Sequence, residues 1–231
     1  MEDQVKIPRL LYIVSGLLVL LGSVAVVLAF RLDGTRAWAN LLLNNVYFVS
    51  LAGGALLFLS IQRVTHSGWS AGFLRVPEAM AAFLPVSAVL FLLMIPGLPS
   101  LYHWAHPGAA EHDALLAHKA PYLNQGFWIA RMAFYFLLWN LMFFLLRRVS
   151  LREDRDGGMA WFRKGEHLAK ITIFLFIITF SFAMIDWVMS IDAHWYSTIF
   201  AIRNFVAAFH HASIVIAFIV LIMHTRGYFP F

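Results

Sequence analysis

The chain has 231 residues and no cysteine. Disulfides, c-type haem attachment and cysteine-built iron–sulfur or zinc sites are therefore excluded for these residues. Charged residues make up only 13%, about half the share typical of soluble domains, whereas 61% of the residues are hydrophobic. This composition fits neither a soluble nor a disordered nor a nucleic-acid-binding protein, and it predicts a polytopic membrane protein.

Several catalytic motifs are also missing from the sequence. There is no phosphate-binding or dinucleotide-binding glycine motif, no G-x-S-x-G elbow and no H-E-x-x-H helix. We therefore assign no catalytic residue, and we expect the chain to act as a subunit rather than as a complete enzyme.

Six apolar runs are close to the roughly 20 residues that a helix needs to span a bilayer. The third run is the shortest and is closed by Pro96 and Pro99. We predict an all-α bundle of about six transmembrane helices, forming a single integral-membrane domain over residues 1–231. The expected helices cover residues 10–30, 41–61, 79–95, 127–146, 171–189 and 205–223, with an outer loop at 96–126 and a cytoplasmic loop at 147–170.

The distribution of lysine and arginine predicts the orientation of the bundle. If the N-terminus is cytoplasmic, eleven basic residues lie on the cytoplasmic side, against four on the outer side: Arg31, Arg36, Lys119 and Arg203. Both termini are then cytoplasmic. The densest basic stretch, Arg147 to Lys164, also carries acidic residues, and it is interpreted as a solvated loop without a further role.

Two ionisable residues are expected at the same membrane depth. Asp186 lies near the outer end of the fifth helix, and Arg131 lies about one turn inside the outer end of the fourth, antiparallel helix. Charges inside a membrane are costly and usually pair. We expect Asp186 and Arg131 to pair, either as a structural ion pair or as a contact for a proton or a quinol.

Further polar residues fall in the outer half of the second and sixth helices, whereas the inner half shows little comparable polarity. A histidine at this depth is a haem b ligand, a proton relay or a hydrogen-bonded packing residue, and amides there usually join helices. Haem b would need an opposing histidine, which no other apolar run supplies. The residues are Asn44, Asn45, Arg203, Asn204, His210 and His211.

The outer loop is rich in histidine and carboxylate side chains, which can bind zinc or copper. Their spacing matches no tight metal-ligand pattern, and Pro107–Gly108 separates the first two from the rest. We therefore predict solvated side chains and no metal site. The residues are His103, His106, Glu111, His112, Asp113 and His118.

Two longer stretches have an unusual composition. The first is H-K-A-P-Y-L-N at 118–124, followed by Phe127, Arg131, Tyr135 and Trp139; the second is D-W-V-M-S-I-D-A-H-W-Y-S-T-I-F at 186–200. Together they resemble the second polysulfide-reductase-type (NrfD-like) membrane subunit of alternative complex III, a bacterial quinol:cytochrome c oxidoreductase.

The resemblance implies a multi-pass helix bundle in the bacterial inner membrane. It implies as partners a sister NrfD-like subunit, a multihaem cytochrome c subunit, an iron–sulfur subunit and small membrane subunits. Haem c and iron–sulfur clusters would belong to those partners, whereas this chain would bind none and at most contact a quinone. It also implies that Asp186, Arg131 and His194 lie on a proton path or near quinone.

The sequence departs from the family pattern in three ways. Ala193 stands where the family usually has proline, Ala201 stands where it has glycine, and the chain covers six of about ten family helices. Three alternatives are also open: a purely structural scaffold subunit, a small transporter or a haem b anchor. A transporter would need a polar path reaching both membrane faces, and the sequence does not show one.

Overall fold

The computed structural model describes residues 9–228, which form helices and turns without any strand. In this part of the chain six helical spans are long and apolar enough to cross a membrane, as predicted. Their bounds are α1 Arg9–Leu32, α2 Gly34–Val64, α3 Arg75–Ala81 with α4 Leu84–Leu92, α7 Gln125–Asp156, α8 Met159–Trp187 and α9 Phe200–Thr225.

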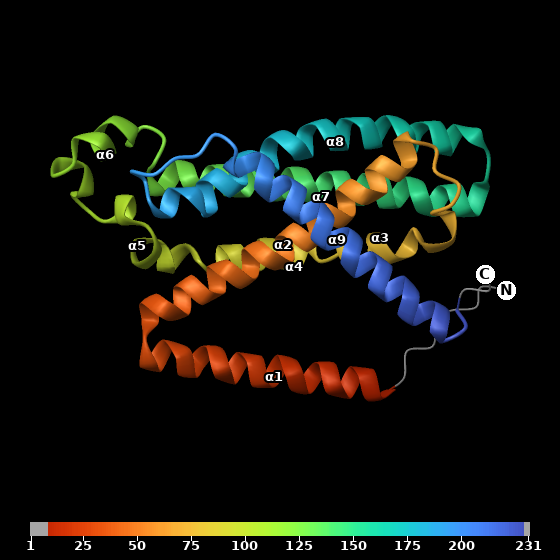
Figure 1. Ribbon diagram of the computed structural model, residues 1–231, viewed down its shortest axis with the longest axis horizontal. Helices are drawn as coiled ribbons and strands as arrows, with labels where there is room; N and C mark the ends of the chain where they lie inside the picture. Colours follow the sequence, from red (N-terminus) through yellow and green to blue (C-terminus); the bar gives the residue numbers. More distant parts are fainter. Residues whose placement is uncertain (1–8, 229–231) are drawn as a thin grey trace.

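The helices α7 and α8 lie antiparallel as one layer, and α2 crosses beside them and is covered in turn by α9 (Figure 1). Consecutive spans run in alternate directions, so the start of α1 and the end of α9 lie at the same end of the molecule. We call this the hairpin end, because it also carries the α7–α8 turn, and we call the opposite end the loop end.

Helix α1 stands apart from the other spans (Figure 1). None of its residues is buried. The ring centroids of Phe30 on α1 and Trp38 on α2 lie 4.7 Å apart, beside the turn that joins the two helices. Its apolar surface is therefore free to face lipid or further helices.

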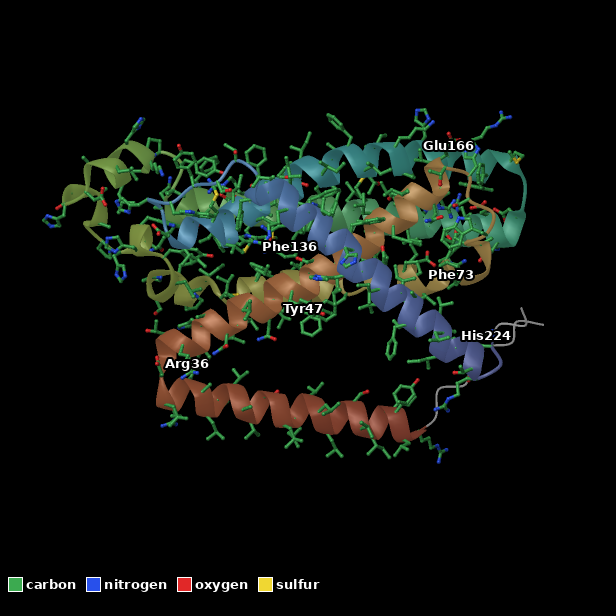
Figure 2. The ribbon with its side chains drawn as sticks, viewed as in Figure 1. Arg36, Tyr47, Phe73, Phe136, Glu166 and His224 are labelled. Atoms are coloured by element: carbon green, nitrogen blue, oxygen red, sulfur yellow. The ribbon has the colours of Figure 1, made fainter. Side chains whose placement is uncertain are left out.

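Aromatic side chains fill the centre of the bundle, where Phe136 lies (Figure 2). The indole of Trp187 stacks on Phe136 at 5.6 Å and approaches Phe91 at 4.1 Å between ring centroids. These three side chains are almost fully buried. They join α4, α7 and the end of α8, so the packing of the core holds the loop end of these helices in place.

The third span is not one continuous helix. It breaks at Ala82 and Phe83 between α3 and α4. Pro85 explains the break, since proline has no N–H to donate to the carbonyl of Ala81 and its ring crowds that carbonyl. The span begins at Arg75, four residues before the predicted start, and α4 ends at Leu92.

The predicted loops need two corrections. Residues 147–170 are helical except around Gly157 and Gly158, where both glycines have positive φ. The α7 helix ends later and the α8 helix begins earlier than hydropathy predicts. Charged residues can extend a helix beyond the membrane core, but they carry no hydropathy signal. The predicted outer loop contains the short helices η2 Ile95–Gly97, α5 Leu98–Leu101, η3 His103–Ala105, η4 Ala109–Glu111 and α6 Ala114–Lys119, and η5 Met189–Ile191 follows α8.

Candidate functional site

The predicted pair of Arg131 and Asp186 is present at the loop end. The Arg131 Nε donates to Asp186 Oδ2 at 2.8 Å, and Nη2 donates to Oδ1 at 2.9 Å. The Arg131 side chain is 10% exposed and that of Asp186 is 1% exposed. Two parallel charge-assisted bonds of this kind are both strong and directional, so the pair fixes α7 against α8.

The remaining acceptors of Asp186 are also occupied. The Tyr135 hydroxyl donates to Oδ2 at 2.8 Å. The Asp186 backbone carbonyl accepts from Trp128 Nε1 at 2.9 Å and from the Ser190 hydroxyl at 2.6 Å. The Asp186 side chain therefore accepts three hydrogen bonds, two at Oδ2 and one at Oδ1.

The arginine is enclosed from its other side by the connection before α7. Its Nη1 donates to the Tyr122 carbonyl at 3.0 Å, and its guanidinium lies 3.8 Å from the Tyr122 ring centroid and 4.3 Å from that of Phe127. Cation–π contacts strengthen when water is removed. The geometry therefore favours a structural role for Arg131 and Asp186.

Residues 96–126 fold over the connection between α8 and α9. The Tyr102 hydroxyl donates to the Trp187 carbonyl at 2.8 Å, and Trp104 Nε1 donates to the Ser190 carbonyl at 2.9 Å. The Lys119 ammonium donates to the Ala193 carbonyl. The outer loop is thus an ordered cover over the last turn of α8.

A cavity of about 260 Å³ lies under this cover, next to the buried ion pair. Tyr122 reaches both, because its carbonyl binds Arg131 and its side chain lines the cavity. Its hydroxyl is buried without a hydrogen-bond partner. The lining residues are Lys119, Tyr122, Leu123, Ile185, Met189, Ser190, Asp192, Ala193, Trp195 and Tyr196.

The third residue implied by the resemblance, His194, lies outside the buried pair. Its Nε2 is 2.7 Å from Asp113 Oδ2, and the side chain is 55% exposed. Asp113 also begins α6, since its Oδ1 accepts from the backbone N–H groups of Leu115 and Leu116. His194 therefore ties the cover to the α8–α9 connection.

This tie predicts acid sensitivity of the cover. Backbone N–H groups of Leu116 and Leu115, together with the imidazole of His194, hold the pKa of Asp113 below its usual value of 3.8. A carboxylate whose pKa is lower in the folded than in the unfolded protein stabilises the fold at pH values above the unfolded pKa. This stabilisation is lost as the pH falls through the lower, folded pKa. Hydrogen-exchange protection of residues 114–119 should therefore be higher at pH 5 than at pH 3. In D113N the two protection factors should agree, and an unchanged pH difference in D113N would contradict the assignment.

The other predicted polar residues do not gather into one cavity. Asn45 is buried and its amide reaches the sulfur of Met94 at 3.1 Å. Asn44 instead donates to the Asn40 carbonyl of its own helix. These two neighbouring amides therefore serve different contacts, one between elements and one within α2.

The residues predicted on the sixth helix lie on the surface of α9. Arg203, His210 and His211 are exposed. The His211 ring is 6.3 Å from that of Tyr47 on α2, and Tyr47 points toward the side where α1 lies (Figure 2). The sequence placed these residues on the sixth helix, but the helix face that they occupy depends on tertiary packing.

Polar groups at the hairpin end were missed. Glu78 is buried at the start of α3 and forms an ion pair with Arg75, a pairing that the sequence did not predict. Arg63 on α2, 11% exposed in its side chain, donates to Glu153 at 2.8 Å. The sequence does carry a signal for these pairs. Acidic residues in 147–164 and basic residues at the ends of two other spans are predicted on the same side of the membrane.

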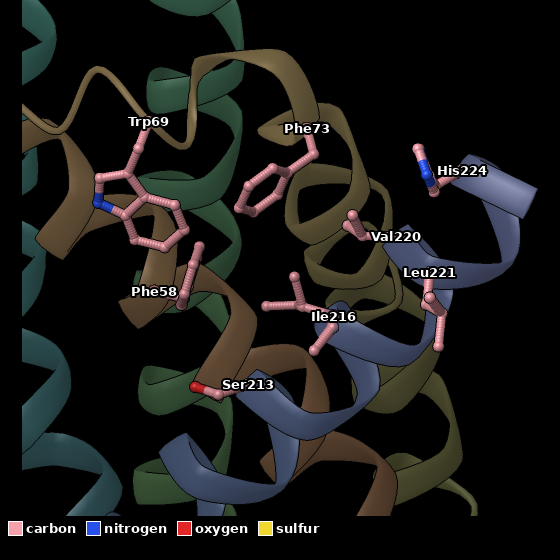
Figure 3. Close-up of a pocket in the computed structure, with 9 residues that line it drawn as sticks. Phe58, Trp69, Phe73, Ser213, Ile216, Val220, Leu221 and His224 are labelled. Atoms are coloured by element: carbon pink, nitrogen blue, oxygen red, sulfur yellow. The ribbon is translucent and has the colours of Figure 1, made fainter. Parts of the chain in front are cut away.

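A second cavity, of about 660 Å³, opens at the hairpin end between α2, the η1 connection (Ala71–Phe73) and α9 (Figure 3). Phe58, Trp69 and Phe73 form its aromatic wall, and His224 lies at one edge. It is distant in the fold from Asp186. Among the described residues no group of three or more histidine or carboxylate side chains is placed to hold a metal ion.

Comparison of the chain with models of protein families and with curated protein sequences finds no match.

Proposed function

We propose that this chain is an integral membrane subunit of a quinol-oxidising electron-transport complex, of the alternative complex III type. One observation carries the proposal: the two stretches that resemble the family meet in a single hydrogen-bonded network. Asp186 from the second stretch binds Arg131 and Tyr135, which follow the first, and Lys119 reaches back to Ala193. Unrelated coincidences of sequence would have no reason to converge in this way.

The surface of α2 and α9 supports the need for partners. His210, His211, Asn44 and Tyr47 are exposed on these two spans. Polar side chains inside a membrane normally face other protein or water rather than lipid. In the proposed complex this face packs against helices of other membrane subunits, including the sister NrfD-like subunit. The multihaem cytochrome c and iron–sulfur subunits carry the haem c and the clusters, and this chain carries no redox group.

The proposed orientation follows the basic residues. In the bacterial inner membrane the hairpin end, where α1 begins and α9 ends, faces the cytoplasm and the loop end faces outward. The ordered cover of residues 96–126 then supports the outer partners and the quinol site. This role needs a rigid loop end, which the buried ion pair of Arg131 and Asp186 supplies.

Proton conduction is a second candidate function. The observation that favours it is the Tyr135 hydroxyl, which bonds Asp186 from within the membrane span. One helical turn deeper, Trp139 Nε1 donates to the Thr179 hydroxyl at 2.8 Å. A relay through Asp186 would require Arg131 to release the carboxylate. The scaffold role needs no such movement, and we therefore rank it first.

Purification of the tagged chain in mild detergent from its own membranes tests the proposal. We expect the chain to co-purify with c-type haem absorbance, with iron and with a second polytopic subunit identified by mass. Mock purification from untagged membranes is the control for trapped cytochromes. A colourless chain that purifies alone would contradict the proposed function.

A further inference from the structure

Most carboxylates of the α7–α8 hairpin pair with basic residues of other elements, whereas most of its own basic side chains do not pair with a carboxylate in the described part of the chain. We define the basic hairpin as residues 147–170, which contain seven lysine or arginine residues and four acidic residues. Three of the four carboxylates pair with basic residues at the end of α2, in the turn after it or at the start of α3. These pairs are Glu153–Arg63 at 2.8 Å, Asp154–Arg75, and Glu166–His66 at 3.3 Å.

Five of the seven basic side chains of the hairpin lie on its outside, whereas Arg147 is half-buried and Lys170 pairs with Glu166. On α7, Arg148, Arg152 and Arg155 follow one another at spacings of four and three, so they share one helix face. All three are exposed, as are Arg163 and Lys164 on α8. No carboxylate pairs with these five side chains in the part of the chain that the structure describes. Internal pairing therefore neutralises the inner side of the hairpin and leaves a cationic outer side.

Trp161 contacts one basic side chain of α7 and one of α8. Its ring lies 4.9 Å from the guanidinium of Arg152 on α7 and 5.3 Å from the ammonium of Lys164 on α8. Tryptophan prefers the level of the lipid headgroups. The ring thus holds two cations close together at the level where the membrane surface is expected.

The length of α7 places these charges within the headgroup layer or just beyond it. Its apolar part, residues 127–146, is about 30 Å long and matches the hydrocarbon core. Arg148 then lies about 3 Å beyond the core and Arg155 about 13 Å beyond it, whereas the headgroup layer is about 5–8 Å thick. Because long basic side chains bend toward the interface and surface attraction extends over about 8–10 Å, the whole row is within reach of lipid phosphates.

We propose that the exposed face of the basic hairpin binds the phosphate headgroups of anionic phospholipids. The occupant is a lipid rather than a soluble acidic protein, because the cations stand within the reach of the membrane surface and flank an interfacial tryptophan. The hairpin thereby anchors the bundle at a defined depth. This inference does not depend on the proposed electron-transport role.

Lipid selectivity in nanodiscs tests the inference. The full chain is reconstituted in discs with equal amounts of phosphatidylglycerol and phosphatidylcholine, and native mass spectrometry counts the lipids that stay bound. We expect phosphatidylglycerol to be retained preferentially. Each neutralised cation should weaken that preference about fivefold, so R148Q/R155Q should lower it about 30-fold, and 0.5 M salt should weaken it in the wild type.

The matched control removes two exposed cations at the opposite end of the molecule, in R31Q/R36Q. It should keep the wild-type preference, and equal helical circular dichroism in pure phosphatidylcholine discs verifies folding of both variants. Equal lipid selectivity of R148Q/R155Q and the wild type would overturn the inference. So would a wild type without preference that instead binds a soluble polyanion, since the cations would then serve an acidic macromolecule.

Discussion

The D186N variant is expected to lose about 3–5 kcal/mol of stability, the typical cost of breaking a buried ion pair. Asparagine fits the space but removes the charge opposite Arg131, whose side chain is only 10% exposed. For a chain of this size the melting temperature should fall by about 10 °C. Tryptophan emission during heating in detergent measures it directly, because Trp128 donates to the Asp186 carbonyl.

Two comparisons make this result specific. D156N changes an exposed carboxylate at the end of α7 and should shift stability by less than about 0.5 kcal/mol. R131Q should resemble D186N, whereas the double variant should lose less than the sum, because neither charge is then left alone. A D186N variant with wild-type melting and a pH-dependent turnover defect in the complex would assign proton exchange to Asp186 instead.

The G54A variant is expected to separate α2 from α9. A Cβ on Gly54 would lie 2.4 Å from the Ala208 carbonyl oxygen and 2.7 Å from the Ala212 Cβ. Neither atom belongs to a flexible side chain, so the helices themselves must move apart. Overpacking of this kind costs about 1–3 kcal/mol, and G54V should cost more.

The matched substitution is G22A on α1. No atom lies within 4 Å of the position that its Cβ would take. Alanine is a better helix former than glycine by about 0.5–1 kcal/mol, so G22A should leave stability equal or slightly higher. Melting of both variants in the same detergent decides the case, and a G54A variant at least as stable as the wild type would contradict the close α2–α9 contact.

Hydropathy predicted the spans well but not their ends. The α8 helix begins at Met159 rather than near residue 171, because a helix continues through charged residues once it leaves the membrane core. The break of the third span before Pro85 was not predicted either, although proline in a helix interior is a known local cause. Both errors have the same cause: hydropathy reports which residues are apolar, but it does not report where the backbone starts, continues or breaks a helix.

For the candidate site, the pairing of Arg131 with Asp186 was predictable and the orientation of the α9 residues was not. Counting residues from the helix ends placed Asp186 and Arg131 at one level, and they form the pair. The same counting placed His210 and His211 at membrane depth but gave no indication that both lie on the exposed face of α9. Which face of a helix is covered depends on how neighbouring helices cross it, and no local pattern encodes that.

The sequence by itself predicted a helical membrane protein and the number of spans, because burial of backbone in a bilayer demands runs of about 20 apolar residues. Only the tertiary structure decided that Tyr135 and Trp128 bind Asp186 and that three carboxylates of the hairpin pair with basic residues of other elements. Hydrogen bonds and ion pairs need atoms within about 3 Å. That proximity arises between residues more than 50 positions apart, as for Tyr135 and Asp186, from the packing of whole helices.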